Sequence, residues 1–196
     1  MEKTISFDLT GKLAIVTGAS RGLGVELATS LAEYGADLAI MATNYEKLKK
    51  TAAAIIEKTG RKVVPFVVNI GDEESVERAV AAVMAEYGKI DILVNNAAIQ
   101  RYGRAEQISA KEWTECLHTN VTGTWMMSKA VVNAYMLNHG GKICNIASVN
   151  AFSATATAPA YHAAKAAVVA LTKSCAVSWA EYGIFVNAVA PGYMVN

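Results

Sequence analysis

A phenol and an ammonium group stand four residues apart at Tyr161 and Lys165. Side chains at that spacing lie next to each other on one face of a helix. A tyrosine has an ordinary pKa of about 10, and a nearby cation favours its ionised form. The pair is therefore suited to passing a proton to or from an oxygen atom. Such pairs also occur on helix surfaces that only meet solvent, so this interpretation needs further groups.

Ser148 is one such group. It follows the apolar run 142–147, which has the composition of a buried strand, and it precedes Tyr161 by thirteen residues. The carboxyl end of a strand in a parallel sheet is the edge at which ligands bind. A serine in that place can also cap a short helix. Beside Tyr161, its hydroxyl is predicted to hold an oxygen of a bound small molecule.

Glycines with the spacing G-x-x-x-G-x-G follow an early β-rich run, at Gly18, Gly22 and Gly24. Glycine is needed where the backbone turns sharply or comes close to a phosphate. The helix that follows presents unpaired N–H groups and a positive dipole end to an anion. Three turn glycines would explain the composition alone, but their place at the first strand-to-helix junction favours a dinucleotide pyrophosphate.

The second β-rich run ends at Met41-Ala42-Thr43-Asn44, where an acidic residue would favour NAD. No carboxylate stands there to repel a 2′-phosphate, and Arg21 in the glycine loop can reach one. This pattern favours NADP over NAD. A solvated Arg21 explains the sequence almost as well, and Thr43 can hydrogen-bond either ribose, so dual specificity stays open.

Alternating strands and helices must position these groups. The predicted strands cover residues 13–19, 37–42, 62–68, 90–95, 142–147 and 184–189. The predicted helices cover residues 25–34, 45–59, 72–87, 109–138 and 158–182. This alternation predicts an α/β fold with a Rossmann-type doubly wound parallel sheet in three layers, and a single domain over residues 1–196.

Composition narrows the classes of partner. The 196 residues carry 18 basic and 17 acidic side chains, a net charge of +1, without a charged block that would attract nucleic acid or an anionic membrane. No apolar run approaches the ~20 residues of a membrane span, and the first residues lack a secretory pattern, so a cytoplasmic location is predicted. The three scattered cysteines suggest neither a disulfide framework nor a metal cluster.

Taken together, the motifs resemble those of the classical short-chain dehydrogenase/reductase family, from about Leu9 to the last residue. The family carries a T-G-x-x-x-G-x-G loop, an N-N-A-G stretch, an asparagine in a long helix, a serine after the fifth strand, Y-x-x-x-K and a P-G pair. The matching residues here are Thr17, Gly18, Gly22, Gly24, Asn95, Asn96, Ala97, Asn120, Ser148, Tyr161, Lys165, Pro191 and Gly192.

The resemblance implies hydride transfer between NADP or NAD and an alcohol or carbonyl substrate, without a metal. Tyr161 would act as acid and base, Lys165 would hold the ribose and lower the tyrosine pKa, Ser148 would orient the carbonyl, and Asn120 would serve a proton relay. The implied cofactor contacts are Gly18, Ser20, Arg21, Gly22, Leu23, Gly24, Thr43, Asn69, Ile70, Asn96, Ala97, Ala98, Tyr161, Lys165, Pro191 and Gly192. A homo-oligomer, dimer or tetramer, is also expected from the family.

Three features depart from the family pattern. Ala98 stands for the last glycine of N-N-A-G, and Asn69 stands for an aspartate near the adenine. Family members also continue past the P-G pair through a covering loop, a helix and a seventh strand, whereas this sequence stops at Asn196. Without that part, we expect weaker exclusion of water and an unpaired sixth strand, with cofactor binding less affected.

Several functions remain open within this resemblance. Residues 96–101 and 191–193 are similar to sugar-acid and polyol dehydrogenases of the gluconate 5-dehydrogenase kind. Reductases of 3-oxoacyl carrier-protein thioesters look alike in the same places, and Arg101 with Arg104 suits an anionic group on either substrate, although surface solvation also explains both arginines. A dinucleotide-binding regulator without turnover, and an isomerase or lyase on the same scaffold, are the alternatives from other classes.

Overall fold

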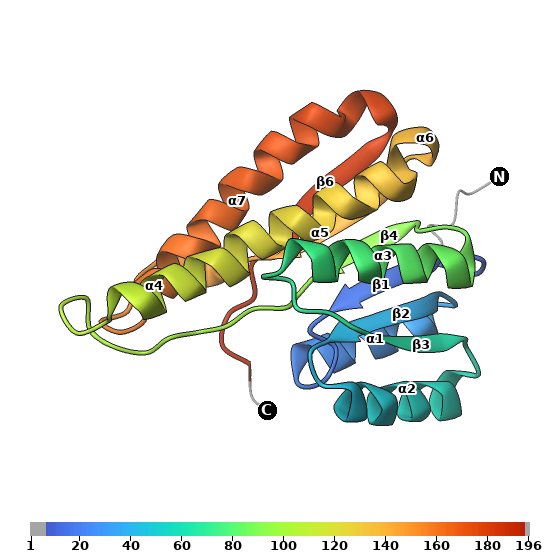
Figure 1. The fold of residues 1–196 in the computed structure, drawn as a ribbon, viewed down its shortest axis with the longest axis horizontal. Helices are drawn as coiled ribbons and strands as arrows, with labels where there is room; N and C mark the ends of the chain where they lie inside the picture. Colours follow the sequence, from blue (N-terminus) through green and yellow to red (C-terminus); the bar gives the residue numbers. More distant parts are fainter. Residues whose placement is uncertain (1–6, 195–196) are drawn as a thin grey trace.

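Six parallel strands form the centre of the computed structural model, which describes residues 7–194 (Figure 1). Their order is β3-β2-β1-β4-β5-β6, the doubly wound order in which the chain leaves β1 in one direction and returns to β4 on its other side. This confirms the predicted fold class. The strands are β1 (Leu13–Thr17), β2 (Asp37–Ala42), β3 (Val63–Val67), β4 (Ile92–Asn95), β5 (Gly141–Ile146) and β6 (Ile184–Val189).

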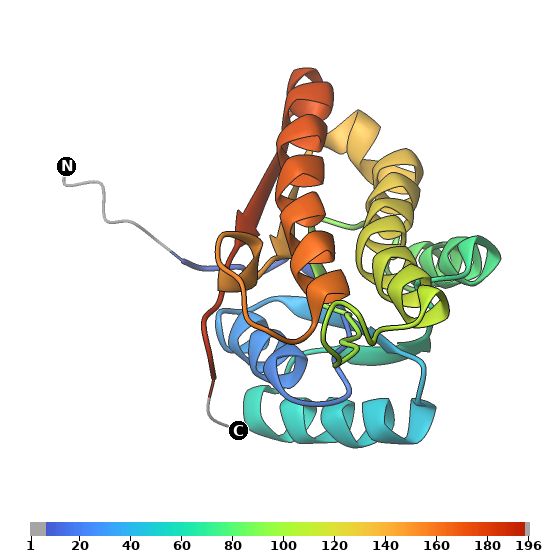
Figure 2. The ribbon, with the colours of Figure 1, turned by 90° about the vertical axis from the view of Figure 1, so that its left-hand side faces the viewer.

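Helices cover both faces of this sheet and make the three predicted layers. Figure 2 shows α1 and α2 on one side, and α3, α5 and α7 on the other. Each face has its own core of buried apolar side chains, rich in alanine where α1 packs on β1 and in methionine where α5 packs on β4. The helices are α1 (Leu23–Glu33), α2 (Tyr45–Thr59), α3 (Glu73–Tyr87), α4 (Ala110–Leu117), α5 (Gly123–Val131), α6 (Leu137–His139) and α7 (Pro159–Trp179).

Side-chain caps and glycines set most helix boundaries. Asn44 accepts a hydrogen bond from the Lys47 N–H at the start of α2, and Ser109 with Glu112 forms a reciprocal capping box at the start of α4. Gly60 ends α2 in the left-handed conformation, at φ 68°. These local signals explain why the predicted boundaries agree with the structure to within a few residues.

The long helix predicted over 109–138 is not continuous. Two π turns, η1 (His118–Thr122) and η2 (Val132–Met136), separate α4, α5 and α6. Such turns insert one residue into a helix and often occur at functional sites. Asn120, a predicted site residue, lies inside η1, and its side chain hydrogen-bonds the backbone of Ile99. Two 3₁₀ turns, η3 (Val149–Ala151) and η4 (Ala180–Tyr182), flank α7.

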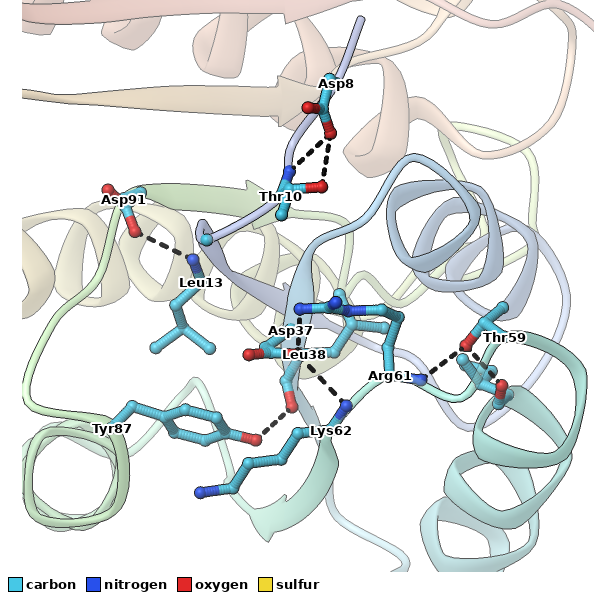
Figure 3. Close-up of polar contacts among 12 residues, drawn as sticks. Asp8, Thr10, Leu13, Asp37, Leu38, Thr59, Arg61, Lys62, Tyr87 and Asp91 are labelled. Atoms are coloured by element: carbon cyan, nitrogen blue, oxygen red, sulfur yellow. Dashed lines mark hydrogen bonds and ion pairs between the residues drawn. The ribbon is translucent and has the colours of Figure 1, made fainter.

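Polar side chains at the amino edge of the sheet bind one another (Figure 3). Asp91 accepts a hydrogen bond from the Leu13 N–H at 2.9 Å, which joins the segment before β4 to β1. Asp37 binds the Arg61 guanidinium at 2.7 Å and the Lys62 N–H at 3.2 Å, which joins β2 to the segment before β3. The polar groups at this edge are occupied in holding the strands together. The predicted site residues lie at the opposite, carboxyl edge of the sheet.

The strand β6 forms one edge of the sheet and pairs with β5. Its Phe185 is 61% exposed, with the Lys142 ammonium 4.6 Å from the ring centre. The other edge strand, β3, contains Pro65, which an edge strand tolerates because proline lacks a donor N–H. Among residues 7–194, β6 is paired on one side only, with β5.

Candidate active site

The loop between β1 and α1 folds so tightly that only glycine fits at two of its positions. A Cβ atom on Gly24 would lie 2.2 Å from the carbonyl oxygen of Gly18, and one on Gly18 would lie 2.8 Å from the Cα atom of Ala97. Gly18 also has a positive φ of 69°. The loop is therefore pressed against the start of α1 and the end of β4, where the strand order reverses.

The start of α1 is open to an anion. Gly22 stands at its N-terminal cap with φ 54°, and no side chain hydrogen-bonds the first N–H groups. In contrast, α2 and α3 are closed by Asn44 and Asp72. Backbone N–H groups and the helix dipole favour a phosphate at such an end. The residues present thus fit the pyrophosphate of a dinucleotide, and Ser20, Arg21 and Leu23 lie on the same loop.

Asn96 braces this loop from the neighbouring strand. Its amide nitrogen donates to the carbonyl oxygens of Thr17 at 2.9 Å and Gly18 at 3.3 Å. In return, the Thr17 hydroxyl accepts the N–H groups of Asn96 and Ala97, each at 3.0 Å. The Asn96 side chain is thus committed to the protein, and direct cofactor contacts from Asn96, Ala97 and the exposed Ala98 stay predictions.

The residues predicted to read the adenosine half lie at the carboxyl ends of β2 and β3. Thr43 is exposed just after β2, whereas the side-chain oxygen of Asn44 accepts the Lys47 N–H and so caps α2. Asn69 is exposed, but its side-chain oxygen accepts the Gly71 N–H at 3.1 Å, and Ile70 is buried. Thr43 is therefore the better placed of these groups for a ribose hydroxyl.

Tyr161, Lys165 and Ser148 come together at the carboxyl edge of β5. Tyr161 and Lys165 project from the first two turns of α7, and the Lys165 nitrogen lies 5.5 Å from the centre of the Tyr161 ring. Ser148, which follows β5, lies near the Tyr161 phenol and acts to lower its pKa, and its hydroxyl accepts the Asn150 N–H at 3.2 Å. Lys165 is only 4% exposed and donates to the carbonyl oxygen of Ile146 at 2.5 Å.

Burial dominates the protonation of both groups. It raises the pKa of Tyr161, and the hydrogen bond from Ser148 opposes this to a smaller extent. It also lowers the pKa of Lys165 to about 8. Desolvation is the larger effect on Tyr161, and the Lys165 ammonium is bound to the Ile146 carbonyl, so the lowering of the tyrosine pKa by Lys165 stays a prediction. Tyr161 is consequently a protonated phenol at neutral pH.

Asn120 fixes the loop that follows β4. Its side-chain oxygen accepts the Ile99 N–H and its amide nitrogen donates to the Ile99 carbonyl, both at 2.8 Å. The residue is 1% exposed, and its amide nitrogen also lies 3.4 Å from the Cys116 sulfur. Since both ends of the amide are used, the side chain positions the backbone, and the proposed relay through Asn120 stays a prediction.

Backbone hydrogen bonds tie the remaining loops to this site. The Val149 N–H donates to the Pro191 carbonyl at 3.0 Å, which places Pro191 and Gly192 beside the turn that carries Ser148. The Ala158 N–H donates to the Gly103 carbonyl at 3.0 Å, just before α7.

Ala158 and Cys116 are two site residues that the sequence did not single out. Among residues 7–194, Ala158 is the one non-glycine residue with positive φ, at 74°. Such strain in an alanine costs on the order of 1 kcal/mol and often marks functional sites. No sequence signal announces it, because alanine is not a residue that favours this conformation. Cys116 lies four residues before Asn120 and contacts its amide nitrogen.

Comparison with known proteins identifies the family. The sequence model described as short chain dehydrogenase matches residues 12–195, so the chain belongs to the short-chain dehydrogenase family and is an oxidoreductase. Gluconate 5-dehydrogenase of Gluconobacter oxydans is 41% identical over 190 residues, covering 97% of this chain and 74% of that protein. A 3-oxoacyl acyl-carrier-protein reductase of Vibrio harveyi is 41% identical over 187 residues, covering 95% and 75%.

Solved structures agree with this assignment. A gluconate 5-dehydrogenase from Burkholderia cenocepacia, solved with NADP and tartrate, superposes with a TM-score of 0.92 at 37% identity and covers 97% of this chain and 74% of its own. A xylitol dehydrogenase bound to NAD⁺ superposes with a TM-score of 0.92 at 35% identity, covering 95% and 72%. The chain therefore spans about three-quarters of the length of these relatives.

Within residues 7–194, no helix is long and apolar enough to cross a lipid bilayer. No group of three or more histidine, cysteine, aspartate or glutamate side chains in the same range is placed to hold a metal ion.

Proposed function

We propose that this chain reduces a ketone or aldehyde with NADPH, and that Tyr161 is the proton donor. The observation that carries the proposal is the half-buried phenol of Tyr161, near Ser148 and close to the Lys165 ammonium, at the same sheet edge as the glycine cradle. One relative is named a gluconate 5-dehydrogenase and another a 3-oxoacyl acyl-carrier-protein reductase. The family assignment therefore agrees with either direction of the reaction.

The residues divide the work of one reaction. A nicotinamide dinucleotide held by the glycine loop would supply a hydride to the carbonyl carbon of the substrate. Ser148 holds the carbonyl oxygen, and Tyr161 transfers its phenolic proton to that oxygen as negative charge develops there. Lys165 supplies a positive charge beside the phenolate that is left, and the glycine loop holds the pyrophosphate. Because burial raises the pKa of Tyr161, its phenol is protonated at neutral pH and can donate its proton to a carbonyl oxygen.

Arg21 supports the preference for NADPH. It is exposed beside the open start of α1 and takes part in none of the ion pairs formed among residues 7–194. A guanidinium with free donors suits the 2′-phosphate, and no carboxylate follows β2 to repel it. One relative was solved with NADP and another with NAD⁺, so the residues of this chain decide the preference.

Arg101 supports an oxidised sugar acid as the substrate. Its guanidinium binds Glu115 at 3.0 Å and remains 40% exposed, so part of its donor set is available to a carboxylate. Its charge reaches Cys116, next to Asn120, where it opposes the rise in thiol pKa that burial causes. Arg104 is more exposed and pairs with Glu106, which suits a more distant anion, as on a carrier-protein thioester. A 3-oxoacyl thioester is therefore the second candidate.

We also propose a homo-oligomer assembled through α5 and α7. Both helices leave apolar side chains exposed: Trp125 on α5 is 41% exposed and Val177 on α7 is 81% exposed. An interface between two copies of the chain would cover them. Light scattering on the purified chain would show a dimer or larger if these faces pair, and a monomer would contradict the proposal.

A single substitution separates an enzyme from a regulator that only binds the dinucleotide. Tyr161→Phe should reduce kcat about a thousandfold while leaving NADPH affinity within about threefold, because only the proton donor is lost. Tyr182→Phe, at the far end of α7, is the matched control and should retain activity. Equal activity in the two variants would reject Tyr161 as the acid and favour the non-catalytic or lyase alternatives.

A further inference from the structure

Four polar side chains cross the apolar core between the sheet and the helices α5 and α7. They are Asn95 of β4, Asn145 of β5, Ser128 of α5 and Thr172 of α7, and each is at most 6% exposed. Burial of polar groups is costly unless they are hydrogen-bonded. None of the four takes part in the reaction proposed above, so their retention in the core calls for another explanation.

Hydrogen bonds join these side chains into one continuous polar network. Asn95 donates from its amide nitrogen to the Ser128 hydroxyl and to the Asn145 side-chain oxygen, both at 2.9 Å. Asn145 donates from its own amide nitrogen to the Thr172 hydroxyl, also at 2.9 Å. Asn95 and Asn145 are directly paired in the sheet register, so both amides leave the same face. The network therefore bridges α5, two central strands and α7.

The direction of every proton in the network is fixed. Ser128 gives its one hydroxyl proton to the Thr124 carbonyl at 2.8 Å, and Thr172 gives its proton to the Val168 carbonyl at 2.7 Å. Each hydroxyl can then only accept, so each asparagine must present its NH₂ group. The cost is that the Asn95 side-chain oxygen is buried with no hydrogen-bond partner among the described residues. The pattern of donors and acceptors is therefore matched to the observed positions of α5 and α7.

On α5, the network extends to the π turn that holds Asn120. Thr124, whose carbonyl receives the Ser128 proton, donates from its hydroxyl to the Asn120 carbonyl at 2.8 Å. The polar contacts thus continue from β4 to η1. They hold the turn through which Asn120 fixes the Ile99 backbone.

On α7, the network adds a second anchor to the helix that carries the reacting groups. Thr172 follows Lys165 by seven residues, about two helical turns, so both face the sheet. Lys165 binds the carbonyl of Ile146, and Thr172 binds the side chain of the adjacent Asn145. Two anchors on neighbouring residues of β5 oppose both sliding and rotation of α7. Figures 1 and 2 show α5 and α7 lying side by side over these strands.

We infer that Ser128 and Thr172 are positioning residues for the reaction. Through the Asn95–Asn145 pair they set the placement of Tyr161 and Lys165 relative to the π turn at Asn120, without touching substrate or cofactor. This inference rests on the proposed reductase function. A displacement of about an ångström between reacting groups can cost a large factor in rate.

The test compares two buried threonines of the same local geometry. Thr172→Val keeps the side-chain shape but leaves the Asn145 amide without its acceptor, and Thr172→Ser restores the hydroxyl. Thr51→Val is the matched control, because Thr51 is 8% exposed and its hydroxyl donates to the Lys47 carbonyl within α2, away from the site. All variants are assayed well below their unfolding midpoints. Thr172→Val should lower kcat about tenfold with KM for NADPH within about twofold.

Two outcomes overturn the inference. The first is an equal kcat in Thr172→Val and Thr51→Val, and the second is a loss in Thr172→Val that Thr172→Ser does not recover. A second measurement is independent of turnover: the pH at which NADPH affinity declines should shift in Thr172→Val and not in Thr51→Val, because Lys165 is held by the same helix. If the wild-type chain reduces no carbonyl tested, the reductase proposal fails, and the network stands or falls on that shift alone.

Discussion

Lys165 donates to the carbonyl of Ile146 at 2.5 Å, while its nitrogen lies 5.5 Å from the centre of the Tyr161 ring. The lysine is therefore held by the sheet rather than by the tyrosine. Its charge is almost fully buried, and burial lowers its pKa to about 8. If Lys165 acts as proposed, its protonation should affect cofactor affinity, rate and stability together.

The reduction rate should fall as pH rises through about 8. Lys165 loses its charge there, which weakens its support of the dinucleotide and of the Tyr161 phenolate that forms in the reaction. The reverse oxidation should increase with pH, because Tyr161, whose pKa burial raises, must first lose its proton. Profiles of kcat/KM in both directions check this. Lys165→Arg stays protonated and should flatten the decline; a wild-type profile that is flat from about pH 7 to 9 would contradict the account.

Replacement of Lys165 by Met should stabilise the fold while abolishing activity. The lysine pKa is 10.5 in the unfolded chain and about 8 in the folded one, so between these values the unfolded chain binds more protons and stability rises with pH. Below about pH 8 the buried charge costs its full amount. Lys165→Met should therefore raise the free energy of unfolding by on the order of 2 kcal/mol at pH 7, and by less at pH 9.

Urea unfolding at both pH values measures that difference. Lys173→Met, on the exposed face of the same helix, is the control and should change stability little. If Lys165→Met destabilised the chain by the same amount at both pH values, its hydrogen bond to Ile146 would outweigh the cost of burying its charge.

Addition of one methyl group to the glycine loop should disrupt dinucleotide binding. In Gly24→Ala the new Cβ atom would lie 2.2 Å from the Gly18 carbonyl oxygen, so the backbone of the phosphate cradle must move. We expect NADPH affinity to fall more than about tenfold. Gly60→Ala is the control, because nothing lies within 4 Å of the added atom, although the positive φ of Gly60 strains an alanine. It should cost about 1 kcal/mol of stability and leave affinity unchanged. Similar affinities in both variants would argue against the cradle.

Replacement of Arg21 tests the cofactor preference. Arg21→Gln should weaken NADPH binding about tenfold and leave NADH binding nearly unchanged, because only NADPH carries the 2′-phosphate. Arg78→Gln removes an exposed arginine of α3 and should affect neither cofactor. Equal losses for both cofactors in Arg21→Gln would mean that Arg21 binds the pyrophosphate or only shapes the loop.

The order of strands and helices was predictable from the sequence because local signals are strong at each boundary. The Asn44 cap, the capping box at Ser109 and the glycines after α2 and α3 fix where helices begin and end. The β-rich runs between them are short and apolar, which indicates buried parallel strands. The doubly wound order then follows from the handedness of the crossovers.

The sequence was less informative about side-chain commitments within the site. Asn96 was expected at the cofactor, yet its amide braces the Thr17 and Gly18 carbonyls. Lys165 was expected to act on Tyr161, yet its position depends on the Ile146 carbonyl in a distant segment. Both outcomes depend on long-range contacts and burial, which a motif does not encode. The π turn at Asn120 was hidden for the same reason, since its partner Ile99 lies 21 residues earlier.

Transfer of deuterium is the measurement that tests the central claim most directly. NADPH deuterated at the transferable position of its nicotinamide is incubated with the chain and an oxidised sugar acid, and the product is examined by mass spectrometry and NMR. Hydride transfer predicts one deuterium on the new carbinol carbon, and none when Tyr161→Phe replaces the wild type. A converted product without deuterium would contradict a reductase and indicate isomerase or lyase chemistry at the same site.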